Sequence, residues 1–593
     1  MSATVLCSQP IRGKLLPSLP LHSSTLLAIL LAFLLNGQSG AASYLGQSHE
    51  PDPLLPKAAE LFQDSRWEEL VQLVPDTPAL PADLLYFRGM ALARLQRWEE
   101  ARVAFEKGQD RFSGDKRFAI ELAGVAFKTG RREAAATALR RALKVDPEDS
   151  YTLQFLGTLY LLNENLDAAL KFWNRIDKPR IEEVRWEPTP HLKSDLLDRA
   201  FTLSPATLLT LRDLDTTRAR LEKLEAFTRF RFDLAPQPDQ NFDLIFSSVE
   251  RNGLGNGSWD RVFSVLKGVP YLTAHLDLFN LRRAALNSRS FLRWDAQKRR
   301  LYSSFSGPWR NNPAWHFQLA LDGRRENWSL VNGPPGTPVP PGDLHLRKES
   351  MSAGLGFVPN GRLSWDTGFE LSHRRLDGLS PNAGDWHRFR DGTLLRYRSS
   401  LDFRVLRLPE RRLEAIARFE GDINRFLSPP RSAFGRIQSA LRTRWLPQAK
   451  GDDYAIQLNI RSGSSQGSPP LDELFVLGME RDNHLWLRAH PATRHGKKGS
   501  GWMGRHYLLL NSEFDKAVWQ QAFFQIRAAP FLDIGKMWDG SGGLGSPVWL
   551  WDAGLQLKIR VLGGPAFVFS YGKDLQTGRS VFYSWLSLEK GGN

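Results

Sequence analysis

Residues 454–461 read Tyr454-Ala455-Ile456-Gln457-Leu458-Asn459-Ile460-Arg461, and large apolar side chains alternate there with small or polar ones. Successive side chains of a β-strand point to opposite faces, so this stretch predicts a strand with one apolar and one polar face. The same period of two recurs at 315–322 and at 401–406. Helical periodicity ends near residue 253, and we therefore expect a sheet domain over residues 253–593.

Strands with one apolar face suit two kinds of domain. In a soluble sandwich the apolar face points inward, whereas in an outer-membrane barrel it faces lipid and the polar face lines a wet lumen. The 19 tryptophans and 35 phenylalanines suit the aromatic girdles of a membrane barrel. About 340 residues, at roughly 20 per strand and connection, allow an antiparallel transmembrane β-barrel of about 16 strands. The Pro/Gly-rich segment 332–342 is predicted to be a connecting loop.

Residues 1–42 have the three parts of a secretory signal peptide. Arg12 and Lys14 supply positive charge, residues 25–35 form an uncharged apolar run, and Gly40-Ala41-Ala42 offers small residues for cleavage. The apolar run is about half the roughly 20 residues that a spanning helix needs, so cleavage is favoured over an uncleaved anchor. This leader also favours the barrel over the sandwich.

Composition excludes several classes of protein. The chain has 593 residues and a formal net charge of +15, which suits nucleic acid or anionic lipid as a partner. Export argues against nucleic acid. The single cysteine, Cys7, lies in the leader, so a disulfide framework and a cysteine zinc site are both excluded.

Three series of residues recur at a period of 34 within residues 54–177. They are Gly89, Ala123 and Gly157; Ala101, Ala135 and Ala169; and Phe105, Leu139 and Trp173. Small residues let paired helices approach closely, and a large residue fills the gap to the next pair. The pattern resembles the tetratricopeptide repeat, an α-solenoid with a concave face for a protein partner. A generic helical bundle is the alternative.

Residues 178–251 predict a small α/β module with the order β-α-α-β-β. Residues 181–186 suit a strand, Leu211, Leu214, Leu221 and Leu224 share one helical face, and residues 230–234 and 242–246 alternate with a period of two. The order resembles the POTRA domain, a periplasmic module that precedes outer-membrane assembly barrels. Such domains can pair an edge strand with an extended client. An unrelated α/β linker domain is the alternative.

Ordered motifs near the C-terminus extend this resemblance. Residues 474–478 end in Gly478, residues 485–490 read Leu-Trp-Leu-Arg-Ala-His, and residues 531–535 read Phe-Leu-Asp-Ile-Gly. Together they are similar to motifs of the BamA/TamA/TpsB superfamily, which also includes the bacterial surface antigens. In that superfamily the long sixth extracellular loop folds back into the barrel.

The resemblance implies that Arg488 meets Asp533 in the lumen and pins this loop, with Gly478 and Gly535 in the same motif. A guanidinium inside a barrel must be either hydrated or paired with an anion, and a carboxylate can bind it with both oxygens. Ala489 stands where the family has glycine, and His490 where it has an aromatic residue.

No catalytic residue, cofactor or metal site is predicted. Gly463-Ser464-Ser465-Gln466-Gly467 has the Gly-x-Ser-x-Gly pattern of a nucleophile elbow, but no helix follows it, so we expect a polar turn. His484, His490, His495 and His506 have spacings of 6, 5 and 11, which match no metal motif. With Arg494, Lys497 and Lys498 they predict a solvated basic loop.

These features predict a non-enzymatic outer-membrane factor for protein assembly or translocation in a Gram-negative bacterium. The repeats and the POTRA-like module would lie in the periplasm and pass an unfolded or extended client protein to the barrel, which contacts outer-membrane lipid. A periplasmic protein would bind the repeats, and no nucleic acid is expected. The alternative is an export pore for polysaccharide or another solute. The client and the choice between insertion and translocation lie beyond the sequence.

Overall fold

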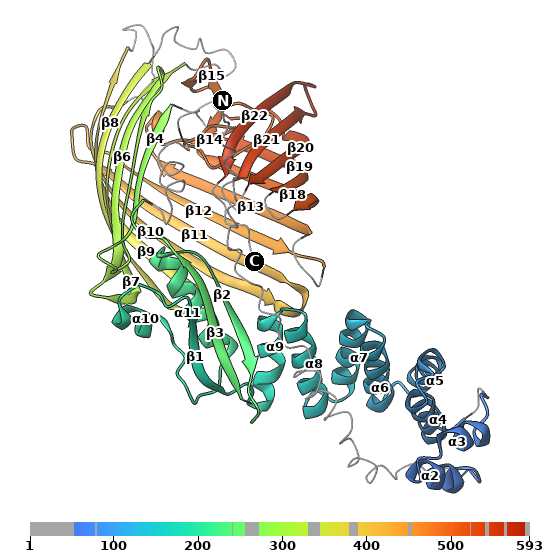
Figure 1. Cartoon of the computed structure of the whole chain (residues 1–593). Coiled ribbons are helices and arrows are strands. Elements are labelled where there is room, and N and C mark those ends of the chain that lie inside the picture. The colour runs from blue at the N-terminus through green and yellow to red at the C-terminus, as the bar shows by residue number, and fades with distance from the viewer. Residues whose placement is uncertain are drawn as a thin grey trace, which may run out of the picture.

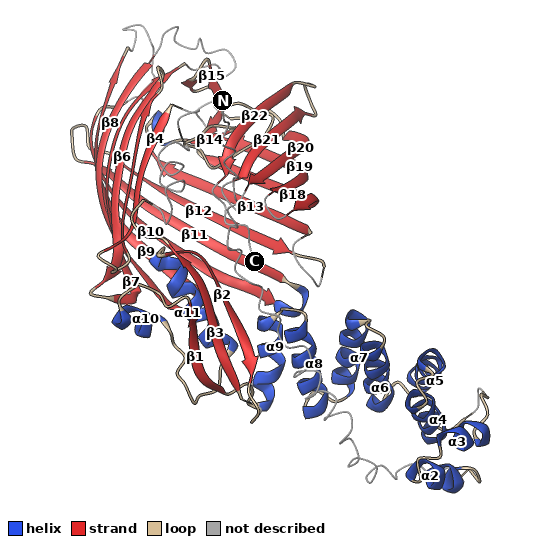
Figure 2. Cartoon of the chain, viewed as in Figure 1, coloured by secondary structure: helices blue, strands red, loops and turns tan. Residues whose placement is uncertain are grey.

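The computed structural model is an elongated molecule in which a helical arm leads to a large barrel (Figure 1). It describes residues 52–77, 80–239, 241–254, 268, 272–329, 344–378, 390–448, 453–521, 524–539, 545–561 and 566–587. The predicted leader 1–42 and loop 332–342 lie outside these residues. Within the described parts of the chain, α-helices occur only in the arm and in the module beside it (Figure 2).

The arm consists of paired helices across most of residues 54–177. They are α2 (Leu55–Gln63), α3 (Trp67–Leu73), α4 (Ala82–Arg94), α5 (Trp98–Arg111), α6 (Lys116–Lys128), α7 (Arg132–Val145), α8 (Ser150–Leu162), α9 (Leu166–Trp173) and the short η1 (Asn174–Ile176). The side chains of Asp115, Asp149 and Asn165 accept hydrogen bonds from backbone N–H groups at the starts of α6, α8 and α9. Such caps satisfy donors that have no partner within the helix.

The three sequence series are the packing contacts of this arm. Phe105 lies where a Cβ atom on Gly89 would be, and Trp173 occupies the same place against Gly157. Ala101, Ala135, Ala169 and Ala123 are fully buried. Small residues therefore bring the helices close enough for one aromatic side chain to fill the space between them.

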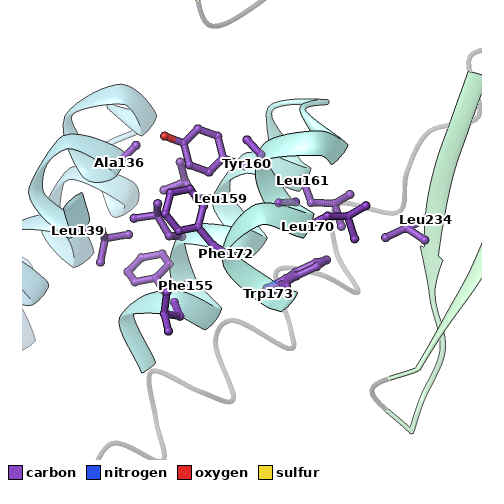
Figure 3. Close-up of a cluster of buried hydrophobic side chains, with 14 of the residues drawn as sticks. Ala136, Leu139, Phe155, Leu159, Tyr160, Leu161, Leu170, Phe172, Trp173 and Leu234 are labelled. Atoms are coloured by element: carbon purple, nitrogen blue, oxygen red, sulfur yellow. The ribbon is translucent and has the colours of Figure 1, made fainter. Parts of the chain in front are cut away.

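The α/β module has the predicted order of elements. It contains β1 (Ile181–Glu187), α10 (Ser194–Ala200), α11 (Leu211–Leu224), β2 (Phe227–Pro236) and β3 (Phe242–Glu250). Its three strands pair in the order β1-β3-β2, with β1 parallel and β2 antiparallel to β3. The last repeat packs on this sheet: Trp173 and Leu170 of α9 lie in one cluster with Leu234 of β2 (Figure 3). The arm and the module therefore share a hydrophobic core.

The remaining strands form one large ring. The long ones are β4 (Thr273–Leu281), β5 (Leu286–Trp294), β6 (Lys298–Trp309), β7 (Asn312–Trp328), β8 (Leu344–Asn360), β9 (Leu363–Asp377), β10 (Gly392–Leu408), β11 (Leu413–Phe426), β12 (Ala433–Trp445), β13 (Tyr454–Gly467), β18 (His506–Gln521), β19 (Phe524–Trp538), β20 (Leu550–Val561), β21 (Ala566–Asp574) and β22 (Ser580–Ser587).

Neighbouring long strands pair antiparallel in chain order from β4 to β22, and the ring order places β22 beside β4. The wall of the ring holds these 15 long strands in the described residues. Two short strands, β15 (Thr493–Arg494) and β16 (Lys497–Lys498), pair with each other, and β16 also pairs with β7, whereas β13 pairs directly with β18. The fold is thus a helical repeat arm, an α/β module and an antiparallel barrel close to the predicted size.

The apolar face of the barrel points outward. In β11 the consecutive residues Asp422 and Ile423 are 3 % and 67 % exposed, and in β7 Leu321 is exposed where Asp322 is buried. Further exposed apolar side chains include Leu319, Phe403, Ile437 and Phe582. Charged residues therefore face the interior and apolar residues the surroundings, as in a barrel that lies in lipid. No helix in the described residues is long and apolar enough to cross a bilayer.

The two ends of the barrel differ. One end has tight connections, such as residues 310–311 and 361–362, and the other has the longer connections 329–343, 378–391 and 468–505. The module docks at the tight end, where α10 contacts β7 and α11 contacts β7 and β8 (Figure 1). Asn165 of α9 donates to the Pro409 carbonyl in the β10–β11 connection, and Lys171 pairs with Glu410 at 2.7 Å.

Candidate functional site: a loop held inside the barrel

Residues 468–505 connect β13 to β18, and we call them the lumen loop. They include η4 (Leu471–Glu473), β14 (Phe475–Leu477), β15, β16 and β17 (Trp502–Gly504), and β14 pairs with β17. The loop binds strands around much of the ring, from β5 to β12 on one side and from β18 to β21 on the other. A segment that reaches opposite walls of a barrel must pass through its interior.

Arg488 is the centre of the first group of contacts. Its Nε donates to Asp533 Oδ2 at 2.8 Å and its Nη2 to Asp533 Oδ1 at 2.6 Å, which is the two-point geometry of an arginine–carboxylate pair. Its Nη1 also donates to Glu513 at 2.8 Å, and its guanidinium carbon lies 3.8 Å from the ring centre of Phe531. Arg488 and Asp533 are buried, at 6 % and 0 % exposure. The contact implied by the resemblance is therefore present.

Glu473 is the centre of a second group, which faces the opposite wall. Arg374 of β9 donates to it at 2.8 Å and Lys348 of β8 at 3.0 Å. Arg436 of β12 donates at 3.1 Å, and Arg396 of β10 also donates. The neighbouring Asp472 accepts from Arg374. Four strands thus supply cations to the two carboxylates of one short helix.

A third group ties the loop to β5, β6 and β7. Asp482 accepts from Arg293 at 2.7 Å and from Arg300 at 2.8 Å. Lys298 donates to Glu480 at 2.6 Å, and Lys498 donates to Glu326 at 2.7 Å. All these side chains are largely buried. Each charge is paired, which is the condition for burying it at tolerable cost.

Glycines provide the room that the loop needs. Gly478 has a φ of +140°, and a Cβ atom there would lie 2.8 Å from the His490 carbonyl oxygen. A Cβ on Gly535 would lie 3.1 Å from Leu487, and one on Gly572 only 2.5 Å from the Arg488 carbonyl oxygen. Gly478 and Gly535 were predicted members of the site, whereas Gly572 was not.

Two sequence interpretations of this region are wrong. Lys498 and His490 do not belong to a solvated loop: Lys498 lies in the third group, and His490 Nδ1 lies 2.9 Å from Asp552 Oδ1. Residues 463–467 are not a turn but the last residues of β13. The serine of the Gly-x-Ser-x-Gly pattern is Ser465, and its buried hydroxyl has no hydrogen-bond partner among the described residues, so the pattern has no triad behind it.

Most partners of the loop could not be found from sequence. Glu473, Glu480 and Asp482 precede Arg488 in a segment without regular periodicity, and the strand cations come from five or more separate strands. One available signal was the charge on the polar faces of strands, such as Arg374 and Arg396. Because buried cations need anionic partners, several arginines on the inward faces of strands predict that an acidic segment fills the lumen.

Residues 120–180 match the tetratricopeptide repeat family. This stretch runs from within α6 to just beyond η1, in the second half of the helical arm. Curated proteins give no match to this chain.

Solved structures share parts of the fold at low identity. CdiB from Escherichia coli is 13 % identical, with a TM-score of 0.43, over 70 % of this chain and 75 % of that chain. BamA from Haemophilus ducreyi, in a structure lacking POTRA domains 1–3, is 12 % identical, with a TM-score of 0.39, over 68 % and 84 %. CdiB from Acinetobacter baumannii is 13 % identical, with a TM-score of 0.41, over 68 % and 72 %. The architecture described above rests on the strand order of this chain itself.

Proposed function

We propose that this protein is a non-enzymatic outer-membrane factor that inserts or translocates client proteins. The observation that carries the proposal is the lumen loop, which is bound to opposite walls of the barrel by buried ion pairs. A segment pinned across the channel narrows it, so a client would have to displace the loop in order to pass. The bound loop would keep the barrel closed to small solutes between clients.

The outward apolar face supports an outer-membrane location. Side chains such as Leu321, Ile423 and Ile437 would be costly in water and are suited to lipid tails. Tight turns usually face the periplasm in such barrels and long loops the outside. The repeat arm and the α/β module, which dock at the tight end, would then lie in the periplasm.

The arm supports a protein client. Tetratricopeptide repeats offer a concave helical surface to a protein partner, and in the POTRA-like module β1 and β2 are the two edge strands of the sheet. An extended client could add to such an edge through main-chain hydrogen bonds. The client would pass from the arm to the barrel mouth, where α11 lies, and contact with outer-membrane lipid would follow there.

Depletion of the protein tests this function. We expect the levels of one or more outer-membrane barrel proteins, or of secreted proteins, to fall, with cell-surface polysaccharide unchanged. A change in barrel proteins would indicate insertion, and a change in the secreted proteome alone would indicate translocation. Loss of exported polysaccharide with an intact proteome would overturn the proposal in favour of the solute pore.

A further inference from the structure

One histidine and two aspartates from three separate segments meet at the end of the barrel that carries the long loops. His490 belongs to the lumen loop, Asp552 to β20 and Asp574 to the end of β21. One donor atom from each lies within 4.8 Å of the other two. We propose that these side chains bind a first-row divalent transition-metal ion, for which zinc is the best fit.

The carboxylate of Asp552 is buried beside His490. Its Oδ2 accepts from the Ala489 backbone N–H at 2.6 Å and lies 3.2 Å from His490 Nδ1. Its Oδ1 lies 2.9 Å from the same nitrogen without hydrogen-bond geometry, and no other described residue bonds it, although the side chain is fully buried. Leaving a buried carboxylate oxygen unsatisfied is costly. A cation bound there would remove that cost.

His490 and Asp574 lie next to this carboxylate, and each ring nitrogen of His490 faces one of the two aspartates. His490 Nδ1 lies 2.9 Å from Asp552 Oδ1, and its Nε2 lies 3.6 Å from Asp574 Oδ2. Asp574 is itself fixed by the backbone N–H of Gln576, at 2.9 Å, and by the Thr577 hydroxyl. Partners that orient a ligand in this way are typical of metal sites.

The chemistry of the donors selects the ion. One imidazole nitrogen and two carboxylate oxygens suit zinc, which binds three protein ligands and leaves a fourth position for water. Calcium prefers six to eight oxygen ligands, and this set offers too few. The sequence spacing of the histidines could not reveal the site because its aspartates lie 62 and 84 residues beyond His490.

Bound metal would tie the tip of the lumen loop to β20 and β21. Arg488, two residues earlier, holds β18 and β19 through Glu513 and Asp533. The two contacts together would fix the tip to four consecutive strands. This inference does not depend on the proposed function, because metal binding can be measured whatever passes through the barrel.

The test uses the full chain purified in detergent, stripped with a chelator and titrated with zinc against a chromophoric competitor. We expect one equivalent to bind, and Asp574→Asn and His490→Gln to lose it while retaining heat-modifiable migration of a folded barrel. His506→Ala, which removes a histidine of the same end of the barrel, should bind as the parent does. Cobalt in place of zinc should give a visible absorption band that Asp574→Asn lacks.

A competing arrangement needs no metal, since a protonated His490 could pair with both carboxylates. In that case zinc would show no saturable binding, or would bind equally to the parent and to both variants, and the proposal would be overturned. Hydrogen exchange of residues 485–492 gives a second measurement. Zinc should slow exchange there several-fold in the parent and leave the rate of folded Asp574→Asn unchanged.

Discussion

Asp167 in the last repeat helix accepts a hydrogen bond from Arg407 of β10 at 2.5 Å, although 240 residues separate them. Arg218 of α11 donates to the other oxygen of Asp167 at 3.1 Å, and Arg407 also pairs with Asp215 of α11. Arm, module and barrel therefore meet in one ion-pair cluster. The arm is bound to the barrel through charges as well as through its connection in the chain.

Replacing Arg407 with alanine should loosen this docking. Asp167 and Asp215 would lose a shared cation, at a cost of about 1–3 kcal/mol, below that of a fully buried pair because a quarter of the Asp167 side chain stays exposed. Hydrogen exchange of α9 and α11 in the full chain should then increase. Arg411 is an exposed arginine in the nearby β10–β11 connection, and Arg411→Ala should leave the exchange unchanged. Unchanged exchange in Arg407→Ala would mean that the hydrophobic contacts alone hold the arm.

Acid should weaken the same contact within a defined range. Burial alone would raise the pKa of Asp167, but the guanidinium groups of Arg218 and Arg407 outweigh it and lower the pKa to about 2. A lowered folded-state pKa means that the contribution is fully present above the ordinary value of 3.8 and is lost as the pH falls through about 2. Exchange in α9 should rise over that range in the parent, and the rise should be smaller in Asp167→Asn.

Removing the Arg488 side chain should release the tip of the lumen loop. Arg488→Ala leaves Asp533 buried and unpaired, which costs about 3–5 kcal/mol. Arg488→Lys keeps the charge but cannot bind both carboxylate oxygens, so an intermediate effect is expected. Protease sensitivity of residues 478–490 in the purified protein measures the release.

The double variant Arg488→Ala/Asp533→Ala distinguishes the loss of the ion pair from the cost of leaving Asp533 buried without a partner. It removes both charges, so it should resist protease better than Arg488→Ala alone. If both variants were as resistant as the parent, the ion pair would not hold the loop, and Leu487 and its apolar neighbours would.

The barrel was predictable because its signal is local. An alternation such as that of Tyr454 to Arg461 fixes both the strand and its two faces, and each strand repeats the signal. The repeat arm was predictable for a similar reason, since Gly89 and Phe105 recur at a fixed period and do meet. Neither inference needs a long-range contact.

The site was only partly predictable because its contacts join distant segments. Arg488 and Asp533 could be paired only through the family resemblance, as no spacing along the chain places them together. Glu473 has no such motif, and its partners follow from a loop path that cannot be read from the residues. The sequence around His490 predicts a solvated residue, because the two aspartates beside it in the structure come from later strands.

Two barrel glycines that contact the lumen loop, Gly535 and Gly572, allow a comparison of how closely the loop packs at each position. Gly572→Ala places a methyl group 2.5 Å from the Arg488 backbone oxygen, which must then move, whereas Gly535→Ala meets the flexible end of Leu487 at 3.1 Å. Protease sensitivity of the loop should therefore rise much more in Gly572→Ala. Gly323→Ala, on β7, whose Cβ meets nothing within 4 Å, controls for the addition of a methyl group to a barrel strand. Similar behaviour of the Gly535 and Gly572 variants would contradict this packing.

Glu121 should make the arm less stable as the pH rises. Burial raises the pKa of this α6 carboxyl to about 7, against the lowering effect of a hydrogen bond from Tyr86 at 3.3 Å. The folded arm therefore holds the proton more tightly than the unfolded one, and the stabilisation present below the ordinary value of 4.5 is lost as the pH rises through about 7.

Glu121→Gln removes this titration. Hydrogen exchange of α4 and α6 should be slower in the variant than in the parent at pH 8, because the parent must keep a charge in a partly buried position. At pH 5 the difference should be small. Glu148→Gln, on an exposed side chain of the same arm, should match the parent at both values. A Glu121→Gln arm that exchanges faster than the parent at pH 8 would show that the ionised carboxylate, bonded to Tyr86, is the stabilising form.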